Sequence, residues 1–434
     1  MGSLYTKRLR FAPVGVWGIC CLLILTRTGW AAQHIVPTQF PTIQGAINTA
    51  AAGDDVLVLP GVYNELINLL GKAITLHSEQ GPAETTIDAT GLSGTVVTCN
   101  TGEGPTTVIR GFTITGGTGT VLGPIVGGGM LNGTASPTVV DCVFRDNTAQ
   151  QGGGMWNNAS SVRIVNCVFE SNTGSFTGGG IWSFESDFTI TNCLFNANDA
   201  VFAGGAIHNV TSSPTITNCT FSANSGGGVI TSENLSIPVL TNSVIWGNFA
   251  AALDGDVFSH VVNYSDIQGS FPGVGNIAID PLYADELGSD GIPGTGDEDL
   301  RLSTGSPCND AGNNDAVPAD GADLDEDGDS LERTPVDLDG SGRFTDDPAS
   351  ADSGNAGMNG PPIVSMGAYE FPHAVCGLSG DLNQDGLVNG DDIGGYVRAK
   401  LGQPSEPGEE PLCADFNTGS LEGDTAAFVG LLLQ

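Results

Sequence analysis

The chain has 434 residues, of which 49 are Asp or Glu and only 13 are Lys or Arg, so its formal net charge at pH 7 is -36. A protein this acidic repels nucleic acid and anionic lipid and attracts divalent cations, which excludes nucleic acid as a partner. Charged residues make up 14% of the chain and glycine accounts for 64 residues, which favours turn-rich β structure over a helical or mixed enzyme domain.

The first 31 residues have the pattern of a secretory signal. Three basic residues within the first ten precede an apolar run over residues 11–25, and small residues follow around Gly29 and Ala31. The apolar run is too short to indicate a membrane span. We therefore expect residues 1–31 to be removed, no transmembrane span to remain after cleavage, and the protein to be secreted or displayed on the cell surface.

A short helix is predicted over residues 40–50, because Ile43, Ala46, Ile47 and Ala50 share one helical face. Such a helix would cover the open end of a stacked β structure, where strand edges and apolar core would otherwise be exposed. Short β-rich runs separated by turn residues then follow from residue 53 onward. This beginning looks like that of secreted β-helix proteins of the pectin-lyase-like superfamily.

Residues 127–248 repeat about every 25 residues, and each copy carries two signatures. The first is a glycine cluster followed by an aliphatic residue, and it begins at Gly127, Gly152, Gly178, Gly204 and Gly226. The second contains Cys-x-Phe in four copies, at Cys142/Phe144, Cys167/Phe169, Cys193/Phe195 and Cys219/Phe221. An Asn or Asp precedes each cysteine, and an asparagine follows three residues after each phenylalanine, at Asn147, Asn172, Asn198 and Asn224.

A unit of this length with short strands and no helical apolar period predicts one coil of a parallel β-helix. Residues two apart on a strand point the same way, so the cysteines and phenylalanines should form two inward columns. The residue before each cysteine should sit at a turn, because Asn tolerates a left-handed backbone and its amide can bond to the next copy. The cysteines can serve as small apolar groups or form bridges in an oxidising exterior.

The two signatures resemble those of the chlamydial polymorphic outer membrane proteins. Gly204-Gly205-Ala206-Ile207 and Phe221-Ser222-Ala223-Asn224 match that family's Gly-Gly-Ala-aliphatic and Phe-x-x-Asn patterns fully. The resemblance implies an all-β fold, a right-handed single-stranded parallel β-helix on a bacterial surface. We expect it to span residues 33–284 with its N-terminal cap.

In the strand after each glycine cluster, alternation sends Met155 and Ile181 inward and therefore sends Trp156, Trp182 and His208 outward in one column. Flat aromatic faces with polar edges could stack on sugar rings, so this column is a candidate ligand site. Neighbouring aromatics on a solenoid can also simply pack on each other. Glu185 and Asp187 lie just beyond the column and could form an acid/base group with His208.

Two absences argue against an enzyme. Polysaccharide lyases of this fold need a basic residue on the solenoid face, and the basic residues of this region sit in no recognisable acidic cluster: Lys72, Arg110, Arg145, Arg163 and Arg301. The glycosidase signatures of the fold, an Asn-x-Asp with paired Asp and a Gly-His-Gly, are missing as well. We therefore predict a carbohydrate or cell-surface and matrix binding protein, with an extracellular polysaccharide lyase or glycoside hydrolase as the alternative.

Residues 285–372 are acidic and rich in Gly and Pro, and we expect loops there followed by a strand over 363–371 that closes the solenoid. Alternating carboxylates around Gly328 could form a calcium loop, since Ca²⁺ takes six to eight oxygen ligands from a tightly turning chain: Asp323, Asp325, Asp327 and Asp329. A solvated acidic loop is the alternative.

Residues 376–434 contain the clearest metal motif. Six residues occupy ligand positions of a twelve-residue calcium loop, Leu387 through its carbonyl: Asp381, Asn383, Asp385, Leu387, Asn389 and Asp392. The loop and the apolar helix face after it resemble the first repeat of a type I dockerin, a small α-helical EF-hand-like module. A shorter second copy begins at Asp415 and Asn417. The resemblance implies Ca²⁺ as a cofactor and a cohesin-like partner; docking to another envelope protein is the alternative.

Overall fold

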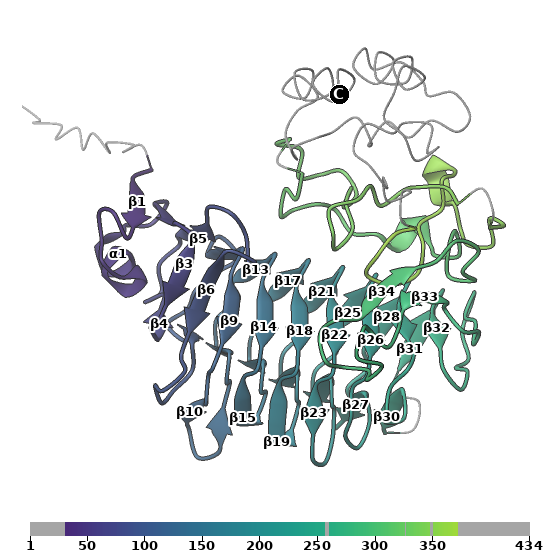
Figure 1. Ribbon diagram of the computed structural model, residues 1–434, viewed down its shortest axis with the longest axis horizontal. Coiled ribbons are helices and arrows are strands. Elements are labelled where there is room, and N and C mark those ends of the chain that lie inside the picture. The colour runs from purple at the N-terminus through teal and green to yellow at the C-terminus, as the bar shows by residue number, and fades with distance from the viewer. Residues whose placement is uncertain (1–30, 257–259, 326, 348–349, 372–434) are drawn as a thin grey trace, which may run out of the picture.

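The computed structural model describes residues 31–371, except 257–259, 326 and 348–349. The predicted secretory signal up to residue 30 and the predicted calcium module at 376–434 lie outside the described residues. Successive turns of the chain stack side by side along one axis (Figure 1), so each turn adds one strand to each of three long parallel sheets.

The longest sheet, sheet A, has ten strands. In order they are β1 (Gln33–Val36), β2 (Asp55–Val58), β5 (Thr75–Ser78), β8 (Val108–Arg110), β13 (Thr138–Val140), β17 (Arg163–Val165), β21 (Thr189–Thr191), β25 (Thr215–Thr217), β28 (Val239–Thr241) and β31 (Val261–Asn263). Sheet B has nine. They are β3 (Gly61–Tyr63), β6 (Thr85–Asp88), β9 (Thr113–Thr115), β14 (Val143–Arg145), β18 (Val168–Glu170), β22 (Leu194–Asn196), β26 (Thr220–Ser222), β29 (Val244–Ile245) and β32 (Asp266–Ile267).

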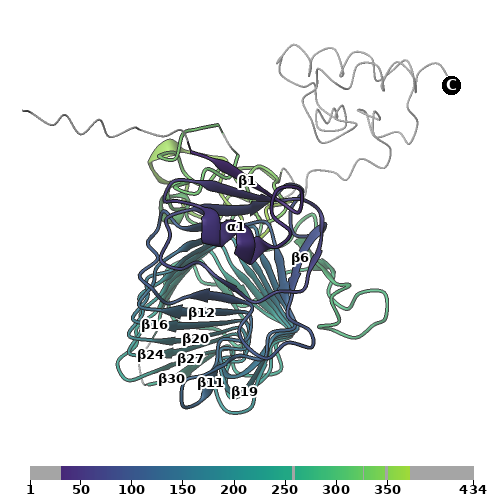
Figure 2. The same cartoon turned by 90° about the vertical axis from the view of Figure 1, so that its left-hand side faces the viewer.

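Sheet C has eight strands, whose stacking is visible in Figure 2. They are β4 (Ile67–Asn68), β7 (Val97–Cys99), β12 (Met130–Gly133), β16 (Met155–Asn158), β20 (Ile181–Phe184), β24 (Ile207–Val210), β27 (Ile230–Glu233) and β30 (Leu253–Gly255). A smaller sheet D precedes sheet C in the middle coils. Its strands are β10 (Thr120–Val121), β11 (Ile125–Val126), β15 (Thr148–Gln151), β19 (Thr173–Thr177) and β23 (Asp199–Ala200).

The inward columns predicted from the repeat are confirmed. The rings of Phe144, Phe169, Phe195 and Phe221 are fully buried and stack at centroid distances of 4.8 to 4.9 Å. The cysteines form a parallel column of free, buried thiols, so the apolar alternative is correct for them: Cys142, Cys167, Cys193 and Cys219. Each of these thiols lies 3.2 to 3.3 Å from the carbonyl oxygen two residues before it.

The two corners predicted for each coil are also confirmed. The residue that opens the second signature has a φ of 51° to 54°: Asp141, Asn166, Asn192, Asn218 and Asn242. The glycine that opens the first signature has a φ of 68° at Gly152, where a Cβ would collide with the carbonyl oxygen of Met155. Only glycine fits a corner this tight, which explains why the cluster recurs in every copy.

A second set of asparagines forms a ladder inside the solenoid, at Asn147, Asn172, Asn198, Asn224 and Asn248. The Nδ2 of each amide donates to Oδ1 of the next at 3.0 to 3.1 Å. The same Nδ2 atoms also donate to backbone carbonyls, for example from Asn198 to Phe169 O at 2.8 Å. These amides satisfy buried backbone groups where the chain turns and no strand partner is available.

The N-terminal end is covered by helix α1 (Ile43–Thr49), as predicted. Ile43, Ala46 and Ile47 are buried against the first coils, and Oγ1 of Thr42 accepts a hydrogen bond from the amide of Gly45 at 3.0 Å. The carbonyls at the other end of the helix accept from Nζ of Lys72 at 2.6 to 2.9 Å. Lys72 is therefore a helix-capping residue. None of the helices in the described residues has the length and apolar character of a membrane-crossing segment.

Beyond β32, strands β33 (Tyr283–Asp285) and β34 (Asp299–Leu302) form an antiparallel pair, and 3-10 turns η1 (Asn314–Ala316) and η2 (Gly357–Asn359) follow. Residues 303–371, here called the covering segment, lie along the corner between sheets A and B (Figure 1). The strand predicted over 363–371 is wrong, since that stretch is irregular. Its backbone bonds instead to a loop and a corner: Met366 donates to Cys308, and Gly367 donates to Asn242.

The asparagine ladder leads to a stability prediction. Asn198→Ala removes an amide that bonds to Asn172, Asn224 and Phe169, and leaves buried partners unsatisfied. We expect the free energy of unfolding to fall by about 3–5 kcal/mol, measured by urea denaturation. Thr189→Ala, an exposed position on the neighbouring strand, should change it by less than about 0.5 kcal/mol. Equal effects of the two variants would contradict a structural role for the ladder.

Candidate functional site

The predicted outward column exists, but it is buried. Trp156, Trp182 and His208 are in register on β16, β20 and β24, and the two indole rings stack at 5.7 Å with an angle of 6° between their planes. Only 8%, 9% and 5% of these residues is exposed. Trp156 and Trp182 pack with Val126 and Leu131 in an apolar cluster outside the main core. The expected exposure is therefore wrong, because the rings stack on one another and pack with Val126 and Leu131, which leaves little free surface for a sugar.

The acid/base group considered around His208 is not assembled. Nε2 of His208 lies 3.7 Å from Oε2 of Glu233, and burial lowers the pKa of the imidazole. Glu185 is an exposed turn residue with a φ of 49°. The carboxylate of Asp187 accepts from the amide of Ser213 at 2.7 Å, which gives it a role in the turn.

A substitution tests the structural role of the aromatic column. Trp182→Ala should lower the free energy of unfolding by about 3 kcal/mol, because it removes a packed ring from a buried cluster. Chemical denaturation measures the loss. Acrylamide quenching of the wild type should show that Trp156 and Trp182 are shielded from solvent. A neutral Trp182→Ala with strongly quenched indoles would restore the column as a surface site.

An open groove lies instead on the outer face of sheet A, near its N-terminal end. Leu57, His77 and Arg110 are in register on β2, β5 and β8, and alternation points them outward. They line a hollow of about 440 Å³ together with Glu79 and Asp141. Asp141 also lines a second hollow of about 410 Å³, so the two are neighbours along one groove.

Two side-chain pairs set the polar pattern of this sheet A groove. Nε2 of His77 lies 2.9 Å from Oδ1 of Asp55, and Nε of Arg110 lies 2.9 Å from Oδ2 of Asp141. All four side chains are between 24% and 31% exposed, so they are fixed by their partners yet reachable from solvent. Arg110 thus sits beside the carboxylate of Asp141, a pairing that the sequence did not indicate.

The covering segment forms the second wall of the groove. Leu324, Leu338, Asp339 and Tyr369 line the second hollow, opposite residues of the solenoid. The carbonyl oxygen of Leu324 lies 3.5 Å from Nη2 of Arg110. One part of the groove is therefore charged, and the other combines apolar side chains with an aromatic residue.

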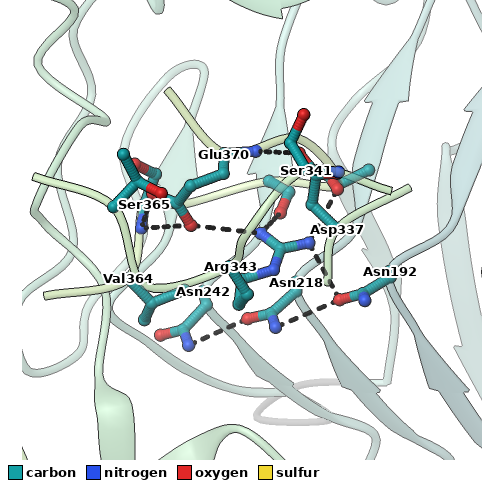
Figure 3. Close-up of polar contacts among 12 residues, drawn as sticks. Asn192, Asn218, Asn242, Asp337, Ser341, Arg343, Val364, Ser365 and Glu370 are labelled. Carbon is teal, nitrogen blue, oxygen red and sulfur yellow. Dashed lines mark hydrogen bonds and ion pairs between the residues drawn. The ribbon is translucent and has the colours of Figure 1, made fainter. Parts of the chain in front are cut away.

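A buried polar cluster holds this wall in place (Figure 3). Arg343, which is fully buried, donates from Nη2 to Oδ1 of Asn192 at 2.9 Å and to the carbonyl of Ala368 at 2.7 Å. Asn192 belongs to the corner ladder, in which Asn218 donates to it at 3.2 Å and Asn242 donates to Asn218 at 3.0 Å. The covering segment is thus anchored on the solenoid's own repeat.

Glu370 completes this cluster. Its carboxyl accepts from the amide of Ser365 at 2.9 Å, and Oε2 lies 3.7 Å from Nη1 of Arg343. Burial raises the pKa of Glu370 from 4.5 to about 8, although the charge of Arg343 lowers it. Burial likewise raises the pKa of Asp337, whose Oδ2 accepts from the amide of Glu370 at 2.7 Å.

The raised pKa of Glu370 predicts that the stability of the protein with the covering segment in place depends on pH. Because the folded state holds the Glu370 proton more tightly than the unfolded state, its contribution is fully present below pH 4.5 and is lost as pH rises through about 8. The wild type should lose stability relative to Glu370→Gln over this range, by about 1.4 kcal/mol per unit of pKa shift. Denaturation of both proteins at pH 5.5 and 8.5 measures the difference. Parallel pH profiles would contradict the buried protonated carboxyl.

The acidic loop predicted to bind calcium is partly assembled. Asp323, Asp325 and Asp327 bring carboxylate oxygens within 4.8 Å of one another, whereas Asp329 is not part of this group. The amide of Gly328 donates to Oδ1 of Asp323 at 3.1 Å, which turns the loop tightly. Calcium binding there stays a prediction. The ligand positions of both calcium loops predicted in the C-terminal module lie outside the described residues: Asp381, Asn383, Asp385, Leu387, Asn389, Asp392, Asp415 and Asn417.

Sequence reasoning missed His77 as a site residue because the first coils are irregular, and it assigned Asp141 only to a turn of the repeat. His77 and Arg110 are 33 positions apart, and the regular spacing of 25 or 26 begins only after them. One signal was present: each follows a buried aliphatic residue, Leu76 or Ile109, and therefore faces outward on a strand.

Comparison with known proteins agrees with the strand pairing. The family described as "Right handed beta helix region" matches residues 126–244. Together, the parallel register and this match establish a right-handed parallel β-helix. A comparison with curated protein sequences gave no match. The resemblances to polymorphic outer membrane proteins and to dockerins stay predictions.

Solved structures with similar folds include pectin-active enzymes. A pectin methylesterase in complex with a hexasaccharide is 13% identical, with a TM-score of 0.39 over 56% of this chain and 91% of that chain. The pectin methylesterase from carrot has the same identity and TM-score, over 58% and 85% of the two chains. A pectate lyase is 14% identical, with a TM-score of 0.32 over 75% and 90%.

Proposed function

We propose that the protein binds a carbohydrate chain in the sheet A groove, as a secreted or cell-surface protein. The observation that carries this proposal is the groove itself, in which the paired side chains of His77 and Arg110 stand beside an apolar wall containing Tyr369. Sugars are recognised by such a combination, because ring faces pack on aromatic and apolar groups while hydroxyls bond to fixed polar groups.

The charge of the groove favours a neutral polysaccharide over a polyuronate. Asp55, Glu79 and Asp141 outnumber the two basic groups, and Asp339 adds a further carboxylate. An anionic chain would meet this local charge and a protein with a net charge of -36. The groove replaces the aromatic column as the candidate site, since the column is buried.

The competing function is a polysaccharide lyase or glycoside hydrolase. His77 with its Asp55 partner is half-buried in a hollow that also contains Glu79 and Asp141, and such groups can move protons when a substrate is held beside them. A lyase would also need Arg110 to exchange its contact with Asp141 for the substrate. Product formation therefore distinguishes the two functions.

Binding and turnover can be measured on one panel of neutral and uronate polysaccharides. We expect binding without released reducing ends or unsaturated products. His77→Gln should weaken binding at least about tenfold, equivalent to about 1.4 kcal/mol. Binding can be followed by calorimetry and turnover by reducing-end and ultraviolet assays.

His34→Gln provides a matched control. His34 forms the same kind of pair with Asp54, at 2.9 Å, two strands earlier on sheet A and outside the groove. It should leave binding unchanged. Equal loss in both variants would remove the groove from the proposal, and turnover that disappears in His77→Gln alone would establish the enzyme instead.

We further propose that the C-terminal module at 376–434 tethers the protein through a calcium-dependent contact with a cohesin-like or other envelope protein. This part of the proposal is supported by the spacing of Asp381, Asn383 and Asp385 in the sequence. Export follows from the amino-terminal signal pattern.

A further inference from the structure

Three carboxylates from two sides of one loop meet in the covering segment. Asp320, Asp325 and Glu332 each bring an oxygen within 4.8 Å of the others. The base of the loop is fixed by its backbone, because the amide of Asp320 donates to the carbonyl of Glu332 at 2.8 Å and that of Thr334 donates to Pro318 at 2.9 Å. The side chains of Asp320 and Glu332 therefore start from paired positions, and Asp325 is folded back toward them.

The second observation is that two of the carboxylate oxygens are buried without a hydrogen-bond partner among the described residues. Asp320 is 1% exposed, and its Oδ1 is buried with no hydrogen-bond partner among the described residues. The same is true of Oε1 of Glu332. Oδ2 of Asp320 accepts from the amide of Leu324 at 2.7 Å, which orients the carboxyl and leaves Oδ1 directed into the cluster. A buried carboxylate oxygen without a donor is costly unless a positive charge faces it.

The neighbouring arginines direct the following bonds to other oxygens, although the charge of Arg163 acts on Asp320 and lowers its pKa. Nη2 of Arg163 donates to the carbonyl of Ala319 at 2.9 Å, and Nη2 of Arg333 pairs with Oδ1 of Asp315 at 2.8 Å. Burial raises the pKa of Asp320, and burial and the surrounding carboxylates raise the pKa of Glu332. Like charges are thus crowded at this point.

We propose that Asp320, Asp325 and Glu332 bind one Ca²⁺ ion, which locks this loop against sheet A. Ca²⁺ binds oxygen ligands at 2.3–2.6 Å, so two ligand oxygens of one ion can lie up to about 5 Å apart. The oxygens of Asp320, Asp325 and Glu332, which lie within 4.8 Å of one another, meet this limit. The smaller Mg²⁺ binds oxygens at about 2.1 Å and demands a tighter octahedron. Backbone carbonyls or water complete the coordination.

The ion would fix the position of a loop that lines the sheet A groove. The loop residues Ala319 and Leu324 contact Arg163 and Arg110 through their carbonyls, and Leu324 lines the groove. An ion that fixes Asp320 and Asp325 also fixes the backbone between them. This inference differs from the linear loop Asp323–Asp329 predicted from the sequence, and it does not depend on what the groove binds.

The test uses the full chain carrying Asp381→Asn and Asp385→Asn, so that calcium binding at the C-terminal loop is disabled. Calorimetry with CaCl₂ alone counts bound ions, and peptide-resolved hydrogen exchange over residues 318–334 locates them. We expect calcium to slow exchange in this loop and Asp320→Asn to weaken the associated binding at least about tenfold. Mg²⁺ at the same concentration should protect the loop less, and equal protection would overturn the assignment to Ca²⁺.

Asp329→Asn is the control, because Asp329 lies in the same loop and outside the cluster. It should bind calcium as the parent does. Binding lost in Asp329→Asn or Asp323→Asn but kept in Asp320→Asn would overturn the proposal in favour of the exposed loop. No calcium-dependent protection over 318–334 in the parent would overturn it as well.

A fold defect in Asp320→Asn is separated from lost binding by melting with and without chelator. With chelator, the variant should melt at or above the temperature of the parent, since it removes an uncompensated buried charge. With calcium, the parent should be the more stable. A variant that is less stable under both conditions would show that Asp320 has a purely structural role.

Discussion

The whole solenoid depends on satisfying buried polar groups at its turns. Parallel strands satisfy their own backbone by pairing with the coils on either side, but the chain must leave the strand several times per coil. The ladder from Asn147 to Asn248 solves this inside the core, because each amide bonds to the next coil and to a backbone carbonyl. The stacked phenylalanines and free cysteines can fill the core only once these turns are aligned.

The same repeat also organises the outside of the molecule. The corner residues Asn192, Asn218 and Asn242 have left-handed backbones and form a second ladder, whose end at Asn192 receives Arg343 of the covering segment. A segment without regular strands is thereby held in one position along the corner. It forms one wall of the sheet A groove, opposite residues of the solenoid.

Packing on sheet C and the covering segment beside sheet A decide which surfaces are accessible. On sheet C, Trp156 and Trp182 project away from the lumen but are buried, so their contribution is to stability. On sheet A, His77 and Arg110 stay partly accessible, although the carbonyl of Leu324 in the covering segment lies 3.5 Å from Arg110. The acidic loop 318–334 has two roles. Its backbone contacts the solenoid, and its carboxylates form the proposed cation site.

The sequence by itself determined the coil. The spacing of Cys142 and Phe144 and of their copies gave the strand direction, the inward columns and both corners, because these are local and periodic properties of the backbone. The helix at Ile43–Thr49 followed from its apolar face in the same way. Only the tertiary structure decided the groove, the burial of Trp182 and the meeting of Asp320 with Glu332. The groove depends on where the covering segment docks, through aperiodic contacts over 100 residues apart, such as Arg343 with Asn192, which leave no repeating signal in the sequence. The burial of Trp182 depends on how sheet C packs with Val126 and Leu131, and Asp320 meets Glu332 through the closure of an aperiodic loop.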